Sequence, residues 1–350
     1  MTARKQYVEM DGLRGVAALS VALFHERDFL GGNSFFGHGY LAVDFFFMLS
    51  GFVLMHAYGE RLQIRDSLAP YLRDRIIRLY PMLVVGSAAG LLLALATKDH
   101  DRSPIGLIAA GIANAAGLPA IWNHRPFYIN EPVWSLFFEI VANVAFGIAA
   151  VWLTRGRLLL LVSLSALLML ALNYHFGFFG FGYARHTLGA GLVRVCASFS
   201  IGLFLHQLHK AGVLSNGGKR WWVAPLLVAS FVAVPFSAKV SLLYDPLIVF
   251  GLYPVLILAS AGSKDLFPPI ATLSGALSYP FYVIHAPTIH LMEQYLIRQG
   301  IILTGATALM NIGATLLVSF LLMRWFDEPV RGYLKGALGS GQHRRALPAS

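Results

Sequence analysis

The sequence predicts an all-α, polytopic integral membrane protein with about ten transmembrane helices. Of its 350 residues, 57% are hydrophobic and only 13% are charged, whereas a soluble domain carries about 25% charged residues. Apolar windows of about 20 residues, the length that a span needs, recur along the whole chain. Lys and Arg outnumber Asp and Glu by 27 to 17. The composition excludes a soluble enzyme, a coiled coil, a disordered chain and a nucleic-acid-binding domain.

Ten windows are expected to cross the membrane, and loop charge sets their orientation. With a cytoplasmic N-terminus, and with 104–121 not crossing, the cytoplasmic segments hold 17 Lys and Arg and the external segments 7. If 104–121 crosses, this asymmetry disappears, which the positive-inside rule disfavours. We therefore expect 104–121 to be re-entrant or shallow, and both termini to be cytoplasmic. The predicted spans are 10–27, 40–58, 79–97, 132–153, 157–175, 189–208, 221–237, 243–261, 272–296 and 303–326.

Among the ionisable residues of the first predicted span, Arg14 and His25 form a pair of interest. They are eleven residues apart, close to three helical turns, so they share one stripe about 16 Å long. Arg14 then lies near the cytoplasmic end and His25 near the external end. Charged groups inside a span are costly and often functional. The alternative is a snorkelling Arg and an interfacial His.

Asp44 and Glu139 are carboxylates that lie in polar motifs inside predicted spans. Asp44 begins the run Asp44-Phe-Phe-Phe-Met-Leu-Ser50, where it needs a partner or a watery cavity, unless it caps the external helix end. Glu139 lies two turns into its span, in Trp134-Ser135-Leu-Phe-Phe-Glu139, on the same side as His25. A His is its natural partner for acid–base work. The alternative is structural pairing with Arg194.

Arg75 and Arg78 lie in a predicted cytoplasmic loop and share a face if that loop is helical. Arg forks bind phosphate in a bidentate manner, although plain topology or anionic lipid explains the same charges. Further along, Ser278, Tyr282 and His285 form a polar stripe that is expected to face the bundle interior. They serve either catalysis or a structural hydrogen-bond network.

No metal site or disulfide framework is predicted. Cys196 is the single cysteine, and the twelve His residues show no ligand spacing accompanied by carboxylate or thiol groups. We expect residues 1–331 to form one membrane domain and 332–350 to form a short, basic, disordered cytoplasmic tail.

The order of these motifs along the chain resembles the acyltransferase-3 family, the bacterial integral-membrane O-acyltransferases that modify glycans. The matching motifs are Asp-Gly-Leu-Arg14 with His25, Asp44-Phe-Phe-Phe-x-Leu-Ser50-Gly, Arg75-x-x-Arg78-Leu-Tyr-Pro, Trp134-Ser135-Leu-x-x-Glu139 and Ser278-Tyr279-x-x-Tyr282-x-x-His285. The resemblance runs from about residue 5 to residue 331, nearly the whole chain. One departure is Ile284-His285-Ala286, where many members have Leu-x-His-Trp-Pro.

The resemblance implies roles for these residues. His25 would be the catalytic histidine with Arg14 as its motif partner, and Arg75 and Arg78 would bind acyl-CoA. Glu139 would join the catalytic group. Supporting positions would be Asp44, Ser50, Trp134, Ser135, Tyr279, Tyr282 and His285.

The implied reaction moves an acyl group, acetyl in the first instance, from cytoplasmic acyl-CoA to a hydroxyl of an envelope or exported glycan or glycolipid. The protein would lie in the bacterial inner membrane, with acyl-CoA as co-substrate, no permanently bound cofactor and no nucleic-acid partner. Direct transfer and an acyl-His relay both remain open. The rival hypotheses are a proton-coupled transporter, which would use the same intramembrane residues, and a haem protein ligated by His25 and His285.

Overall fold

A computed structural model describes residues 7–30, 35–63, 68–97, 103–214, 217–263 and 267–344, with side chains up to residue 338 in the last helix. These ranges contain helices and connecting segments and no strand. The helices are α1 (Val8–His25), α2 (Arg27–Leu30), α3 (Ala42–Tyr58), α4 (Leu68–Ala96), α5 (Pro104–Ala115), α6 (Val133–Ala149), α7 (Arg155–Phe176), α8 (Leu188–Lys210), α9 (Val223–Val232), α10 (Ala238–Pro246), α11 (Tyr253–Ala261), α12 (Pro268–Arg298), α13 (Gly305–Leu322) and α14 (Glu328–Arg344).

Seven helical segments in the described ranges are long and apolar enough to cross a membrane, which confirms a membrane protein. Three further predicted spans fall on α1, α9 and α12, so the count of ten remains a prediction. Helix α9 has only ten residues, whereas α1 and α12 carry polar groups that lower their hydropathy. The seven segments are Gly39–Tyr58, Leu68–Ala96, Val133–Trp152, Arg155–Phe176, Arg185–Lys210, Ala238–Ala261 and Gly305–Leu338.

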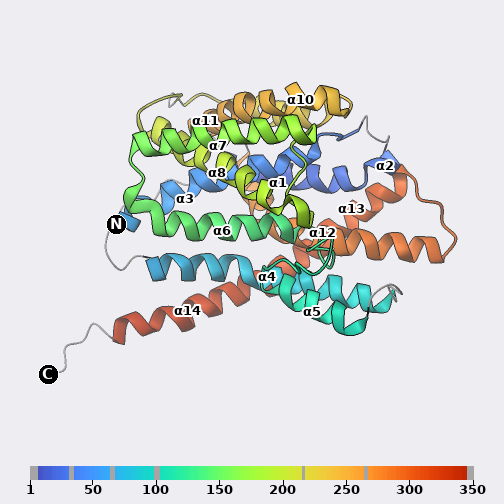
Figure 1. Ribbon diagram of the computed structural model, residues 1–350. Coiled ribbons are helices and arrows are strands. Elements are labelled where there is room, and N and C mark those ends of the chain that lie inside the picture. The colour runs from blue at the N-terminus through green and yellow to red at the C-terminus, as the bar shows by residue number, and fades with distance from the viewer. Residues whose placement is uncertain are drawn as a thin grey trace.

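The stretch 104–121, which was predicted not to cross the membrane, folds as the short helix α5 followed by a turn. Ser103 caps its first turn by accepting a hydrogen bond from the backbone N–H of Gly106. The helix has 12 residues, which at 1.5 Å per residue gives about 18 Å, less than the roughly 30 Å of a hydrocarbon core. It packs against α4 (Figure 1). This length supports the predicted non-crossing segment.

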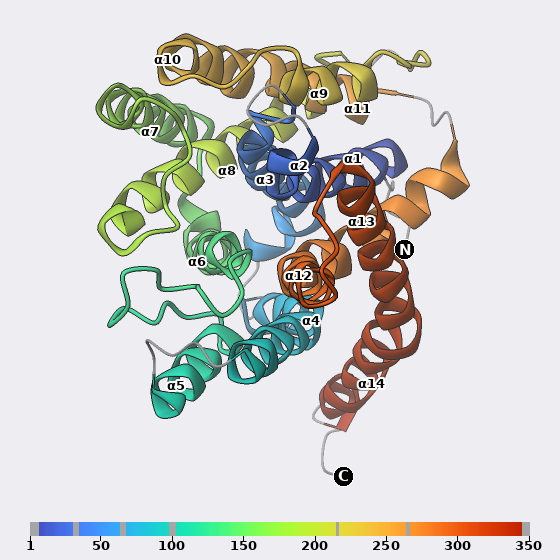
Figure 2. The same ribbon diagram turned by 90° about the vertical axis from the view of Figure 1, so that its right-hand side faces the viewer.

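Helices α1, α3, α8 and α12 form the centre of the bundle, with α7, α10 and α14 toward its edge (Figure 2). Small residues permit the close packing. Gly15 of α1 lies directly against Ser274 of α12, and Gly51 of α3 lies against the backbone of α8 at Phe199. A Cβ at either glycine would clash with these neighbours. Close approach at small residues is the usual packing mode of helices in lipid.

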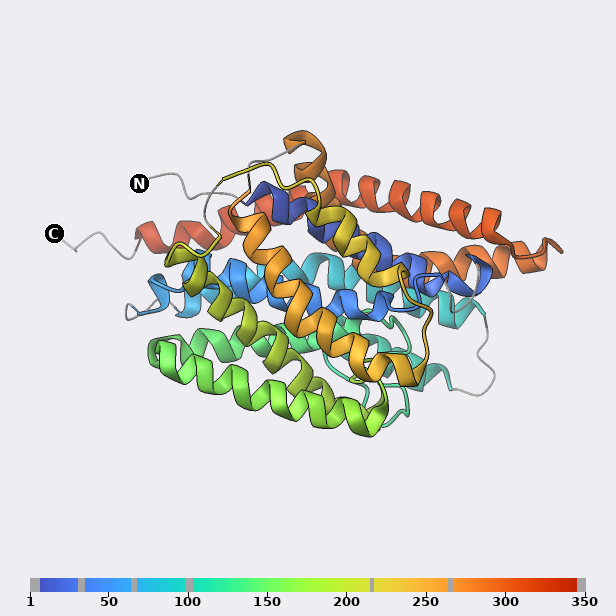
Figure 3. The ribbon, with the colours of Figure 1, turned by 90° about the horizontal axis from the view of Figure 1, so that it is seen from above.

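The start of α1, the start of α4 and the end of α14 lie toward one end of the bundle, and α2 lies at the other (Figures 1 and 3). This arrangement agrees with termini on one side of the membrane. Which side is cytoplasmic remains a prediction.

The C-terminal segment differs from its expected structure, because α14 is helical through Arg344 although a disordered tail was expected from residue 332. Two contacts anchor this helix. Arg331 pairs with the buried Asp327 at 2.7 Å, and Arg73 of α4 donates to the carbonyl oxygen of Leu338 at 3.0 Å. The segment after residue 331 therefore begins as a helix that contacts α4, with most of its described side chains exposed. Residues 345–350 lie outside the described residues.

Candidate active site

Three cavities follow one another through the bundle, and neighbouring cavities share lining residues. The His25 cavity, of about 430 Å³, includes His25, Glu131, Trp134, Tyr282 and His285 in its lining. The central pocket, of about 110 Å³, includes Arg14, Ser50, Arg75, Arg78, Glu139 and Tyr282. The basic mouth, of about 410 Å³, is lined by Tyr58, Arg73, Asp74, Arg75, Ile77, Arg78, Arg331 and Lys335.

The shared residues place the three cavities in order. Arg75 and Arg78 line both the basic mouth and the central pocket. Val43 and Tyr282 line both the central pocket and the His25 cavity. Arg75 and Arg78 therefore lie at the boundary between the basic mouth and the central pocket, and Tyr282 lies at the boundary between the central pocket and the His25 cavity. We call each of these boundaries a threshold.

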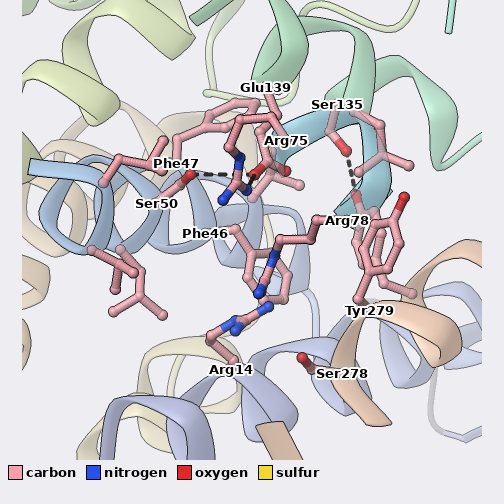
Figure 4. A pocket seen from close by; sticks show the side chains of 16 residues that line it. Arg14, Phe46, Phe47, Ser50, Arg75, Arg78, Ser135, Glu139, Ser278 and Tyr279 are labelled. Atoms are coloured by element: carbon pink, nitrogen blue, oxygen red, sulfur yellow. Dashed lines mark hydrogen bonds and ion pairs between the residues drawn. The ribbon is translucent and has the colours of Figure 1, made fainter. Parts of the chain in front are cut away.

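The central pocket gathers three guanidinium groups around one carboxylate (Figure 4). Arg75 lies 3.9 Å from Glu139, which also accepts a hydrogen bond of 3.2 Å from the Ser50 hydroxyl. The Nε of Arg75 is buried without a hydrogen-bond partner among the described residues. Arg14 and Arg78 point toward each other across the pocket. Because positive charge exceeds negative charge here, the pocket suits an anion.

This geometry corrects the expected location of Glu139. It was predicted to lie beside His25, but it lines the central pocket and not the His25 cavity. Trp134, near the start of α6, does line the His25 cavity, and Glu139 is five residues further along, about 7.5 Å. The difference arises because residues before α6 are themselves buried, Phe127 at 2% exposure and Ile129 at 5%. Helix α6 thus begins inside the protein and not at the external surface.

The threshold residue Tyr282 is held by a short hydrogen bond to Ser135. Their hydroxyl oxygens lie 2.6 Å apart. Ser135 also donates to the carbonyl oxygen of Pro132 at 3.0 Å. Because serine has a single hydroxyl proton, Tyr282 is the donor in the bond to Ser135. This bond joins α6 to α12 at the junction of the central pocket and the His25 cavity.

The two histidines meet at the His25 cavity. His25 ends α1 and is exposed, whereas His285 of α12 is fully buried. Their ring centroids lie 5.2 Å apart, which leaves no room for a porphyrin between them and so does not fit the haem hypothesis. The polar stripe of α12 faces inward as predicted, with Ser278, Tyr282 and His285 all buried.

A proline in α12 positions another acidic residue that the sequence analysis did not select. Pro287 has no N–H to bond the carbonyl of Val283, and Asn130 donates to that carbonyl at 3.0 Å instead. This bond holds the segment before α6 against α12 and places the next residue, Glu131, in the lining of the His25 cavity. The available signal was its position in Asn130-Glu131-Pro132, directly before the Trp134 motif.

Asp44 has a buried charged partner, which decides between the two interpretations of this residue. Its carboxylate lies 2.7 Å from Arg194 and accepts a hydrogen bond of 3.0 Å from Ser198. Arg194 also donates to the carbonyl oxygens of Tyr40 and Phe181. Arg194 thus pairs with Asp44 and not with Glu139. The pair braces α3 against α8 beside the His25 cavity.

The remaining supporting residues connect helices. The hydroxyl of Tyr279 in α12 donates to the carbonyl oxygen of Leu79 in α4. The ring of Trp134 lies under the Arg194 guanidinium, 5.4 Å from ring centroid to carbon. Within the described residues, no group of three or more His, Cys, Asp and Glu side chains is placed to hold a metal ion.

The fold and the site define a polytopic helical membrane protein with polar chemistry inside the bundle. The family model for the acyltransferase-3 group, described as an acyltransferase domain, matches residues 7–324. The chain belongs to this family. It is also 33% identical over 182 residues to "Protein 2 in picA locus" of Rhizobium radiobacter, a match that covers 47% of this chain and 94% of that protein. No solved structure matches the chain.

Proposed function

We propose that this membrane acyltransferase moves an acyl group, acetyl in the first instance, from cytoplasmic acyl-CoA to a hydroxyl of an envelope or exported glycan. The observation that carries the proposal is the sequence of three cavities with shared thresholds. An elongated donor can place its phosphates at Arg75 and Arg78 and its thioester near Tyr282. The acceptor then occupies the His25 cavity on the other side of that threshold.

The charge distribution suits this placement of the donor. The phosphates of coenzyme A are polyanionic, and guanidinium groups bind them with charge-assisted, bidentate hydrogen bonds. The pantetheine arm is extended and carries no charge. The narrow central pocket, open at Tyr282, suits such an arm, and the α1 stripe from Arg14 to His25 is about 16 Å long.

The lining of the His25 cavity suits a sugar. Aromatic rings on several sides include Tyr40, Tyr128, Trp134, Phe178 and Phe236, and such rings pack against the C–H faces of pyranose units. Polar groups for the hydroxyls come from Arg125 and Glu131. A cavity with apolar walls and a few polar groups is the usual form of a small-molecule site.

In the proposed reaction, His25 acts as the general base. Its imidazole takes the proton of the acceptor hydroxyl as the oxygen attacks the thioester carbonyl carbon. The C–S bond then breaks, the ester forms, and the proton passes to the departing thiolate to give free CoA. General-base assistance contributes roughly 10²–10⁴-fold, and alignment of the two substrates across the Tyr282 threshold contributes more.

Mass spectrometry of envelope glycans and glycolipids tests the function. Bacterial cells that express the wild-type chain, His25→Gln or no copy are compared at matched protein level in the inner membrane. We expect an acetyl mass increment on one glycan class only with the wild type. Identical glycans in all three strains would contradict the proposal, and export of a solute that continues without acyl-CoA would favour the transporter hypothesis.

A further inference from the structure

The basic mouth is built by two segments that are far apart in the sequence. Helix α4 supplies Arg73, Arg75 and Arg78, and α14 supplies Arg331 and Lys335. The family match ends at residue 324, so the two α14 side chains lie beyond the matched region. They extend the positive surface outward from the arginines at the threshold of the central pocket.

Two of these cationic side chains form ion pairs with carboxylates of the protein. Arg73 lies 3.6 Å from Asp74, and Arg331 lies 2.7 Å from Asp327. By contrast, neither Arg78 nor Lys335 forms an ion pair with a residue in the described ranges. Lys335 is exposed. The mouth therefore keeps positive charge at two levels, Arg78 at the inner threshold and Lys335 toward the outside.

We propose that the basic mouth binds the nucleotide part of coenzyme A, with Lys335 of α14 contacting the ribose 3′-phosphate. This inference rests on the proposed function. In coenzyme A, the diphosphate joins the pantetheine arm and the 3′-phosphate lies further out on the ribose. A diphosphate at Arg75 and Arg78 directs the arm into the central pocket and leaves the 3′-phosphate outside, on the side of the mouth where α14 contributes its cation.

This arrangement assigns α14 a role in donor selection. Acyl donors that share the phosphopantetheine arm but lack the 3′-phosphate lose the contact with Lys335. Hydrogen bonds to charged groups are the strong class in proteins, and one such bond corresponds to about a tenfold change in affinity or more. The same phosphate chemistry also occurs in anionic lipid headgroups, and the experiment separates the two sources.

Binding of CoA and of dephospho-CoA, which lacks only the 3′-phosphate, tests the proposal without an identified acceptor. Wild-type protein in phosphatidylcholine nanodiscs is titrated with each ligand by calorimetry. We expect CoA to bind about tenfold more tightly than dephospho-CoA. Lys335→Gln is expected to remove most of this preference by weakening CoA alone, and Lys335→Arg to retain it. Lys210→Gln, a charge-matched change near the same end of the bundle and outside all three cavities, is expected to leave both affinities unchanged.

The outcomes separate this inference from the proposed function. Equal affinity of the wild type for the two ligands would overturn the role of Lys335 and leave the acyl-CoA function standing. If neither CoA nor dephospho-CoA binds, the proposed acyl-CoA function itself would be contradicted. The titrations are repeated in nanodiscs that contain phosphatidylglycerol. If Lys335→Gln alters CoA affinity only there, and equally for both ligands, the mouth binds lipid headgroups and the inference is overturned.

Discussion

The imidazole of His285 donates its Nδ1–H to the backbone carbonyl oxygen of Tyr282, 2.7 Å away in the same helix. A carbonyl only accepts, so this bond sets the tautomer of the neutral ring and leaves Nε2 with a free lone pair. That Nε2 is buried without a hydrogen-bond partner in the described part of the chain. His285 also lines the cavity of His25. One residue therefore braces the helix at the Tyr282 threshold and presents a neutral acceptor at the candidate site.

The bond to Tyr282 predicts how His285 variants fold. His285→Ala removes a fully buried side chain, a change that costs about 2–5 kcal/mol for large core residues. It should lower the amount of folded protein more than the activity per molecule. His285→Asn keeps an amide donor close to the position of Nδ1 and should retain more folded protein. Size-exclusion profiles and thermal unfolding in detergent measure this, and equal losses in both variants would contradict the bracing role.

The buried pair Asp44–Arg194 predicts a large loss of stability when one charge is removed. Asp44→Asn leaves the Arg194 guanidinium buried without its counter-charge, which typically costs about 3–5 kcal/mol. The matched control is Glu60→Gln, because Glu60 pairs with Lys210 on an exposed surface and such pairs contribute about 0–1 kcal/mol. Denaturant unfolding of both variants provides the comparison. Similar small shifts would mean that the buried pair is not a structural brace.

Arg75 and Arg78, which line both the basic mouth and the central pocket, are expected to contribute to the affinity for the acyl donor. Arg75→Ala combined with Arg78→Ala should raise the Kd for acyl-CoA at least tenfold, because each charged hydrogen bond contributes about 1.5–3 kcal/mol. The variant should still reach the membrane, where its fold is checked by size-exclusion chromatography. Arg155→Ala, at the exposed start of α7, is the control and should bind normally. An unchanged Kd in the double variant would contradict donor binding by Arg75 and Arg78 and would favour the alternative that they only set the membrane topology.

Substitutions of His25 are expected to abolish acylation while the protein remains folded. Because its side chain is exposed to a cavity at the end of α1, His25→Ala should remain folded while acylation is abolished. His25→Gln keeps some hydrogen bonding but cannot take the proton, so it should be equally inactive. Arg14→Lys should impair activity strongly, because a point charge does not replace a planar fork. O-acyl content per molecule of protein is the readout, and near wild-type acylation by His25→Gln would exclude it as the base.

The loop charges predict the orientation of the bundle. A reporter fused after Arg125 should report the external side, and one fused after Arg157 the cytoplasm. The structural reason is the short α5, whose length does not match a bilayer. Fluorescent and periplasmic reporters at each position provide the measurement. If the fusion after Arg157 is external, the segment 104–121 crosses, and the α4 and α14 residues of the basic mouth would lie on opposite sides of the membrane, which would contradict the site geometry.

Composition and periodicity were sufficient to predict the helical membrane fold and most of the polar motifs. Apolar windows give spans directly, because unpaired backbone groups are too costly in lipid to allow other structures. The inward stripe of Ser278, Tyr282 and His285 followed from helical spacing alone. The closeness of Arg75 and Arg78 followed in the same way, since both are local properties of one helix.

Partnerships between helices depended on packing and could not be predicted from spacing. Asp44 could have paired with several cations, and only the crossing of α3 and α8 brings Arg194 to it. Glu139 was assigned to the depth of His25 because the level at which α6 starts was unknown. Glu131 entered the site because Asn130 bonds a carbonyl that Pro287 leaves open. The sequence shows which charged and polar side chains lie in apolar spans and therefore need a partner. The relative depth and rotation of the packed helices determine which partner each of them contacts.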